Sequence, residues 1–197
     1  MTDDRNLRLA RRAEGEGLVD VAWSTVESPI GPLLVAGTAQ GLVRLWFGTE
    51  PLDRFLGDLA RRISPRVLEA PARLDDVRRQ LDEYFEGRRR SFELALDWSL
   101  SSGFGQRVLR ATNRIPYGEV RTYKAVATEA GNPTASRAAG SALGHNPIAL
   151  VVPCHRVIGS SGSLTGYGGG IERKEFLLRL EGALPGLPLS RGPASAT

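Results

Sequence analysis

Three short apolar runs of strand length open the patterned part of the chain, at residues 19–26, 33–37 and 42–47. Segments containing Pro, Gly and polar residues separate these runs at 28–32 and 38–41. Connections this short favour antiparallel pairing of neighbouring strands. The pattern therefore predicts an antiparallel meander.

Two helical segments follow, at residues 52–62 and 74–85. The second has apolar residues at helical spacing and Gly87 as its stop signal. Residues 92–96 form a candidate strand, because apolar and polar positions mix there over a strand-like length.

A Ser/Gly cluster at residues 99–103 marks a domain boundary. Beyond it the pattern predicts three helices, at 104–114, 123–129 and 134–143. The last two are joined across the turn Gly131-Asn132-Pro133 and have the form of a helix-turn-helix, whose second helix is the candidate DNA-facing element.

That second helix carries almost no bulk: its residues include Ala135, Ser136, Arg137, Ala138 and Gly140. Small side chains let a helix backbone lie close to a neighbouring helix or to the floor of a groove. The residues alone favour tight helix packing and leave groove binding open.

Length and composition place the chain among ordinary globular proteins: it has 197 residues, of which 41% are hydrophobic. No apolar stretch approaches the roughly 18 residues that span a bilayer, and the N-terminus lacks a signal-peptide pattern. We therefore expect a cytoplasmic protein with no membrane association. The predicted organisation is a flexible leader (1–17), an N-terminal domain (18–100), a second domain (101–183) and a flexible tail (184–197).

Charge is distributed unevenly around the net value of +4. Residues 1–100 carry 15 basic and 17 acidic side chains, whereas residues 101–197 carry 11 basic and 5 acidic ones. Arginine accounts for 24 of the 26 basic residues, and its guanidinium binds phosphate oxygens in a bidentate manner. The asymmetry suits a nucleic-acid partner, although a solvated surface would give the same excess.

The single cysteine, Cys154, follows a continuous apolar run at residues 148–152 that fits a buried strand or extended segment. It cannot form an internal disulfide, and a zinc site from one Cys and two His would need carboxylate ligands, so we expect no metal. His155 and Arg156 follow at once, and cationic or basic neighbours favour the nucleophilic thiolate. Taken alone, Cys154 is better explained as an inert buried thiol than as a nucleophile, and only the combination with its neighbours favours the nucleophile.

A Gly-rich loop at residues 159–170 comes next and contains one aromatic residue, Tyr167. It lacks the Gly-Lys-Ser/Thr sequence of a phosphate-binding loop. A flexible connector and a substrate-lining loop are both compatible with this composition.

Together these motifs closely resemble the O6-alkylguanine-DNA alkyltransferases. The resemblance covers residues 102–183 and rests on several separated motifs in one register. The motifs are Tyr117-Gly118-Glu119-Val120 with Tyr123, Asn146-Pro147, Pro153-Cys154-His155-Arg156-Val157, Tyr167, Leu177-Leu178 and Glu181-Gly182. The resemblance implies an α+β fold with an N-terminal ribonuclease-H-like antiparallel sheet plus helices and a mostly helical, winged-helix-like C-terminal domain containing the helix-turn-helix.

The resemblance also implies roles for the residues near the cysteine. Cys154 would accept the alkyl group, and His155 would draw its proton through a water. Glu181 would orient His155, with Asn146 in the same network; from the residues alone, Glu172 and Glu175 are rival partners of His155. Tyr123 would donate a hydrogen bond to the purine as guanine leaves.

The family binds duplex DNA through the minor groove and flips the damaged base out of the stack, which explains a helix with small residues. Arg137 would fill the space that the flipped base leaves, with a phosphate clamp as the alternative role. Val157, Tyr167 and Gly168 would line the guanine pocket. Some relatives carry Ser where this chain has Gly168, which raises the question of whether the loop is looser here and accepts larger alkyl groups.

The activity implied is direct reversal of DNA damage, a single-turnover transfer by a methylated-DNA-[protein]-cysteine S-methyltransferase that needs no cofactor. We expect a monomer; cooperative assembly on DNA and repair of O4-alkylthymine stay open. Rival hypotheses are a non-enzymatic protein that recognises alkylated bases, a Cys-His hydrolase and a helix-turn-helix regulator. The first replaces the acceptor cysteine in known relatives, and the last leaves Cys154 and His155 without a role.

Overall fold

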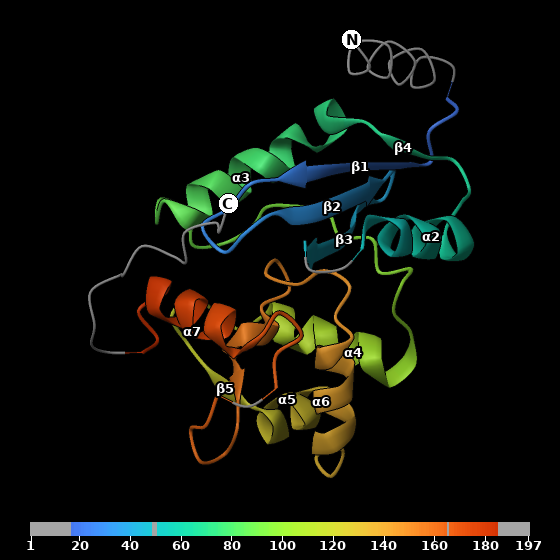
Figure 1. Cartoon of the computed structure of the whole chain (residues 1–197). Helices are drawn as coiled ribbons and strands as arrows, with labels where there is room; N and C mark the ends of the chain where they lie inside the picture. The colour runs from blue at the N-terminus through green and yellow to red at the C-terminus, as the bar shows by residue number, and fades with distance from the viewer. Residues whose placement is uncertain (1–16, 49–50, 165, 185–197) are drawn as a thin grey trace.

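The computed structural model describes residues 17–48, 51–164 and 166–184 and forms two packed parts, one built on a sheet and one built of helices (Figure 1). The predicted mixed α+β class, with an N-terminal sheet and a helical C-terminal part, is confirmed. The predicted leader and tail lie outside the described residues, apart from Gly17 and Leu184.

The N-terminal part contains the predicted meander. Strands β1 (Val21–Val26), β2 (Leu33–Thr38) and β3 (Gly41–Phe47) pair antiparallel in sequence order. A short strand that the pattern did not predict, β4 (Val67–Glu69), pairs parallel to β1, so the sheet order is β3-β2-β1-β4. Three partly exposed residues carry too little periodicity to reveal a strand.

Helices cover both faces of this sheet, because side chains alternate along each strand. Leu33 and Val35 of β2 join the cluster that contains α3 (Asp75–Phe85), which follows the 3₁₀ turn η1 (Pro71–Leu74). Leu34 and Ala36 point to the opposite face. There they pack with Phe55 and Leu59 of α2 (Leu52–Arg62).

The C-terminal part consists of four helices and a small parallel ribbon. The helices are α4 (Gly103–Asn113), α5 (Tyr123–Glu129), α6 (Ser136–Gly144) and α7 (Ile171–Leu180). The ribbon pairs β5 (Arg121–Thr122) with β6 (Val157–Ile158), which directly follows the 3₁₀ turn η2 (Cys154–Arg156). Within the described ranges, no helix combines the length and apolar character that crossing a bilayer requires.

Helices α5 and α6 lie at the end of the molecule remote from the sheet and form the predicted helix-turn-helix (Figure 1). The Thr122 side chain caps α5 by accepting a hydrogen bond from the backbone N–H of Ala125 at 3.1 Å. Along α6, Ala139 is buried while Arg137 and Ala138 are exposed. One side of this helix therefore packs against the protein, as the sequence favoured, and the other side faces outward.

Two segments differ from the expected strands. Residues 92–96 make a single bridge, between Leu96 and Leu42, in which Leu42 N–H donates to Ala95 C=O at 2.8 Å and Asp97 N–H donates to Leu42 C=O at 2.9 Å. Residues 148–152 fold into a tight turn, in which Val152 N–H donates to Ile148 C=O at 2.9 Å. Leu150 occupies the left-handed region there with a φ of 72°, which is unfavourable for a branched side chain.

This turn joins the two parts of the molecule through the backbone. Leu45 of β3 donates its N–H to Pro147 C=O at 2.8 Å and accepts a hydrogen bond from Ala149 N–H at 3.1 Å. One hydrophobic cluster continues across the junction and contains residues of both parts. The segment that leads to Cys154 is thus anchored to the edge of the N-terminal sheet.

Substitutions of two glycines by Ala are predicted to change the free energy of unfolding in opposite directions. Gly57 lies inside α2 with no atom within 4 Å of an added Cβ, whereas Gly41 has a φ of +129° and an added Cβ would lie 2.2 Å from Ala95 O. We expect Gly57→Ala to raise the free energy of unfolding by about 0.5–1 kcal/mol. Gly41→Ala should lower it by more than about 1 kcal/mol. Urea denaturation of both variants tests this; equal effects would contradict it.

Candidate functional site

Cys154 begins η2, directly after the strained turn, and only 6% of its surface is exposed. Pro153 precedes it, and Arg156 N–H closes the turn by donating to Pro153 C=O at 2.9 Å. Cys154 N–H donates to Val152 C=O at 2.8 Å. The thiol is therefore held on a well-ordered backbone near the centre of the molecule.

Asn146 fixes the sulfur from one side. Its Nδ2 lies 3.2 Å from Cys154 Sγ and also donates to Val152 C=O at 2.8 Å, while its Oδ1 accepts from Ile148 N–H at 3.1 Å. The amide is buried and its orientation is set by these backbone contacts. A donor held against sulfur favours the thiolate over the thiol.

His155 and Glu181 form a fully buried pair, in which Nε2 and Oε1 lie 2.9 Å apart. Glu181 follows the last turn of α7. Of the rival carboxylates, Glu175 pairs with Arg179 and Glu172 is exposed on the first turn of α7. The structure thus brings together the four residues predicted around the thiol: Cys154, His155, Asn146 and Glu181.

Glu181 also accepts hydrogen bonds that the sequence did not reveal. Arg156 donates through Nε to Oε2 at 2.8 Å and through Nη2 to Oε1 at 2.9 Å, and the Tyr84 hydroxyl donates to Oε1 at 2.6 Å. Gly118 N–H lies 3.4 Å from Oε2. Arg156 stands in the motif that contains Cys154, but Tyr84 belongs to α3 in the N-terminal part, where its spacing indicates only a core position.

These contacts determine which groups carry charge. Burial by itself would raise the pKa of Glu181, but the hydrogen bonds from His155 and Arg156 outweigh it and lower the pKa to about 2. The carboxylate is therefore ionised and can only accept hydrogen bonds, so His155 Nε2 must be the donor. The lone pair of the neutral imidazole then lies on Nδ1, which is buried and has no hydrogen-bond partner among the described residues.

The reacting groups themselves are held neutral at rest. Burial raises the pKa of the Cys154 thiol, and this outweighs the opposite influence of the Asn146 hydrogen bond and the Lys174 charge. Burial also lowers the pKa of His155, although the hydrogen bond from its ring to Glu181 opposes the change. Neutral thiol and neutral imidazole thus lie next to an ionised carboxylate.

Lys174 is a second buried cation that the sequence did not single out. Its Nζ donates to Val157 C=O at 2.6 Å, and burial lowers its pKa. This contact ties α7 to the strand that follows the nucleophile. Its charge also favours the Cys154 thiolate.

Tyr167, one of the residues expected to line the guanine pocket, lies beside this centre, and Tyr123 lies near the same loop. The Tyr167 ring lies edge-on to the His155 ring, with centroids 6.4 Å apart, and the Tyr123 hydroxyl donates to Gly166 C=O at 3.2 Å. Burial raises the pKa of Tyr123, and the nearby Cys154 adds to this. Gly168 is exposed and follows Tyr167 directly.

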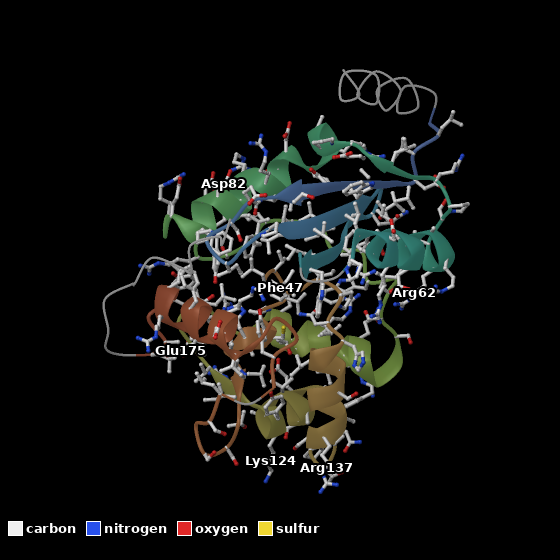
Figure 2. The ribbon with its side chains drawn as sticks, in the orientation of Figure 1. Phe47, Arg62, Asp82, Lys124, Arg137 and Glu175 are labelled. Atoms are coloured by element: carbon white, nitrogen blue, oxygen red, sulfur yellow. The ribbon has the colours of Figure 1, made fainter. Side chains whose placement is uncertain are left out.

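The residues expected to meet DNA lie together on a different surface. Figure 2 shows Arg137 of α6 and Lys124 of α5 at the same end of the molecule, pointing away from the N-terminal part. Gly140 lies against the Tyr123 ring, since an added Cβ would be 3.7 Å from two of its carbons. Tyr123 therefore connects the helix-turn-helix to the loop beside the thiol.

Comparison with known families agrees with this arrangement in both parts of the chain. Residues 21–98 match the ribonuclease-like domain of 6-O-methylguanine DNA methyltransferase, and residues 103–183 match its DNA binding domain. The chain belongs to the 6-O-methylguanine DNA methyltransferase family. The family's DNA binding domain supplies Cys154, His155 and Glu181, whereas its ribonuclease-like domain supplies Tyr84.

Individual members of the family match over most of the chain. A Methanosarcina barkeri methylated-DNA--protein-cysteine methyltransferase is 45% identical over 159 residues, covering 81% of this chain and 96% of the relative. The Mycobacterium tuberculosis protein of that name is 44% identical over 177 residues, covering 90% and 98%. The crystal structure of Mycobacterium tuberculosis OGT in complex with DNA superposes with a TM-score of 0.71 at 42% identity, covering 88% and 96%.

The low pKa of Glu181 predicts how stability depends on pH. A carboxylate whose pKa falls from 4.5 when unfolded to about 2 when folded stabilises the fold above pH 4.5, and this contribution is lost as the pH falls toward 2. The contribution amounts to about 3 kcal/mol. Wild type should therefore lose about that much more stability than Glu181→Gln between pH 5 and pH 2, as measured by urea denaturation.

A matched control is Glu175→Gln, which removes a surface carboxylate from the same helix. Exposed ion pairs contribute little to stability, so this variant should follow wild type over the whole pH range. A Glu181→Gln variant that loses stability in parallel with wild type would contradict the assignment of a buried, ionised carboxylate.

Proposed function

We propose that the protein repairs DNA by transferring the alkyl group of O6-alkylguanine in a duplex to Cys154, irreversibly and once per molecule. The observation that carries this proposal is the buried chain of contacts from Asn146 to the Cys154 sulfur and from His155 to Glu181. Membership of the methyltransferase family supports the same chemistry. Cys154 is also the chain's only cysteine.

The pair Cys154 and His155 would supply the nucleophile. Because Nε2 of His155 is committed to Glu181, the thiol proton passes to Nδ1, and we propose that a water bridges the two groups. The resulting imidazolium is stabilised by the Glu181 carboxylate, which is held in place by the Arg156 guanidinium.

The transfer itself would be an in-line displacement. Sγ bonds to the alkyl carbon, the bond between that carbon and O6 breaks, and guanine leaves with the electron pair. Tyr123 would donate a hydrogen bond to the purine and reduce the cost of this charge. Over the whole reaction the thiol proton ends on guanine, and Cys154 becomes a thioether.

A thioether has no acyl group for water to attack, so the reaction stops after one transfer. This distinguishes the proposal from a Cys-His hydrolase, which must release its product and react again. Among non-enzymatic relatives that recognise alkylated bases the acceptor cysteine is replaced, and here Cys154 is present. A helix-turn-helix regulator would leave the buried network around Glu181 without a use.

DNA would bind across the helix-turn-helix, with α6 in the minor groove. Its exposed small residues allow close approach of the backbone, and Arg137 would enter the base stack as the damaged guanine leaves. The extruded base would stack near Tyr167, with the backbone of Val157 and Gly168 around its edge. The basic character of residues 101–197 suits the DNA phosphates. We further propose that the protein acts in the cytoplasm as a monomer, without a cofactor.

Mass spectrometry after incubation with a duplex containing O6-methylguanine tests the chemistry. We expect one methyl group per protein molecule, located on Cys154, and repaired DNA equal to protein in moles. Cys154→Ser should abolish transfer and retain binding of the damaged duplex, because only the sulfur is changed. An unmodified Cys154, or product in molar excess over protein, would rule out the mechanism.

A second experiment separates the two roles considered for Arg137. Arg137→Ala should slow methyl transfer by about tenfold or more, because extrusion of a base costs a few kcal/mol and the empty space would go unfilled. Lys124→Ala removes a cation from the same end of the molecule and serves as the control. It should weaken binding of undamaged DNA without a comparable loss of transfer rate at saturating DNA. Equal effects of both substitutions would make Arg137 a phosphate clamp.

A further inference from the structure

Two glycines of the Gly-rich loop at residues 159–170 lie directly against strand β3. A Cβ added to Gly168 would be 2.7 Å from Cη2 of Trp46, and one added to Gly169 would be 2.4 Å from Cε2 of Phe47. Neither glycine has a positive φ, so glycine is needed here for space and not for backbone conformation. The two rings occupy the volume that side chains at positions 168 and 169 would fill.

The neighbouring rings continue this contact to the reacting groups. Trp46 lies beside Phe47, with ring centroids 5.6 Å apart, and Phe47 lies 5.7 Å from Tyr167. Tyr167 in turn lies edge-on to His155. The loop is thus supported by aromatic rings of the N-terminal part, and the Trp46 indole of β3 fills the volume beside Gly168.

Trp46 also borders an open cavity. A cavity of about 410 Å³ is lined by Trp46 together with residues of both parts, among them Arg44, Gly144 and Asn146. Gly144 C=O is also close to Gly168, at 3.4 Å from an added Cβ. Trp46 thus borders both the Gly168 backbone and open space, and removing the indole would give the loop room to withdraw.

We propose that Trp46 is a positioning residue that sets the width of the pocket for the O6 substituent, by holding the Gly168 backbone forward. This proposal rests on the proposed function. Gly168 is itself exposed, as a backbone that meets a base requires. Methyl groups fit the resulting pocket, and bulkier groups such as benzyl are disfavoured by the indole behind the loop.

The test compares transfer rates from duplexes that contain O6-methylguanine or O6-benzylguanine. Trp46→Ala should raise the ratio of the benzyl rate to the methyl rate by about tenfold, a change typical of a hydrophobic pocket that gains room. Trp23→Ala is the matched control, because Trp23 is a partly buried tryptophan on β1 of the same sheet. It should leave the ratio unchanged.

A double substitution tests the contact itself. Gly168→Ala places a methyl group against the Trp46 ring and should push the loop into the pocket, so both rates fall and the benzyl rate falls more. Adding Trp46→Ala should restore both rates, which is a coupling that independent sites do not show. If Trp46→Ala does not fold, Trp46→Leu keeps apolar bulk on β3 and makes the same comparison.

The outcomes separate the two proposals. A wild-type protein that leaves Cys154 unmodified by either duplex overturns the proposed function. A wild type that transfers methyl groups, with a benzyl-to-methyl ratio that Trp46→Ala or Trp46→Leu does not change, overturns only the role of Trp46. Strictly additive effects of the substitutions at positions 46 and 168 overturn it as well.

Discussion

The buried carboxylate of Glu181 is the group on which the rest of the site depends. A buried charge is tolerated only when it is paired and fully hydrogen-bonded, and here Arg156, His155 and Tyr84 all donate to it. These donors come from η2 and from α3, so one carboxylate holds together the end of α7, the turn of the nucleophile and the N-terminal part. The orientation of the imidazole follows from this arrangement, because its Nε2 N–H donates to the ionised carboxylate.

The surroundings favour charge on the carboxylate and disfavour charge on the groups that react. Glu181 is ionised at rest, whereas burial disfavours charge on both Cys154 and His155. The thiol is therefore neutral and unreactive at rest, in surroundings whose hydrogen bond and positive charge already favour the thiolate. Such preorganisation means that little has to move when the proton leaves sulfur.

The sequence predicted the elements whose apolar and polar positions form a clear local pattern. The meander, α2 and α5 follow from apolar runs and turn residues, whereas β4 and the ribbon of β5 and β6 are too short to show periodicity. The turn at Leu150 was missed because a continuous apolar run says nothing about a positive φ. Its Ile, Leu and Val residues suit a strand just as well.

The site residues likewise divide into those that the sequence predicted and those that it did not. Cys154 and His155 are adjacent, and the family register selected Glu181 from three carboxylates that the residues alone could not distinguish. Tyr84 and Trp46 were not predicted, because each reaches the site through a contact between the two parts of the chain; the Tyr84 hydrogen bond to Glu181 spans 97 positions. No spacing rule relates residues so far apart, and their side chains are ordinary core aromatics in sequence.

The backbone bridge between Leu45 and the segment 147–149 limits which segments of the chain could be produced separately or exchanged between relatives. β3 is an edge strand, and this segment covers part of its open side, beside the bridge from Leu42 to Leu96. A fragment of residues 103–183 would encode the thiol, imidazole and carboxylate but would lose that strand partner and the hydroxyl of Tyr84. Recombination between relatives would therefore have to exchange β3 and the segment before the cysteine together. What is inherited as a unit is the junction between the two parts.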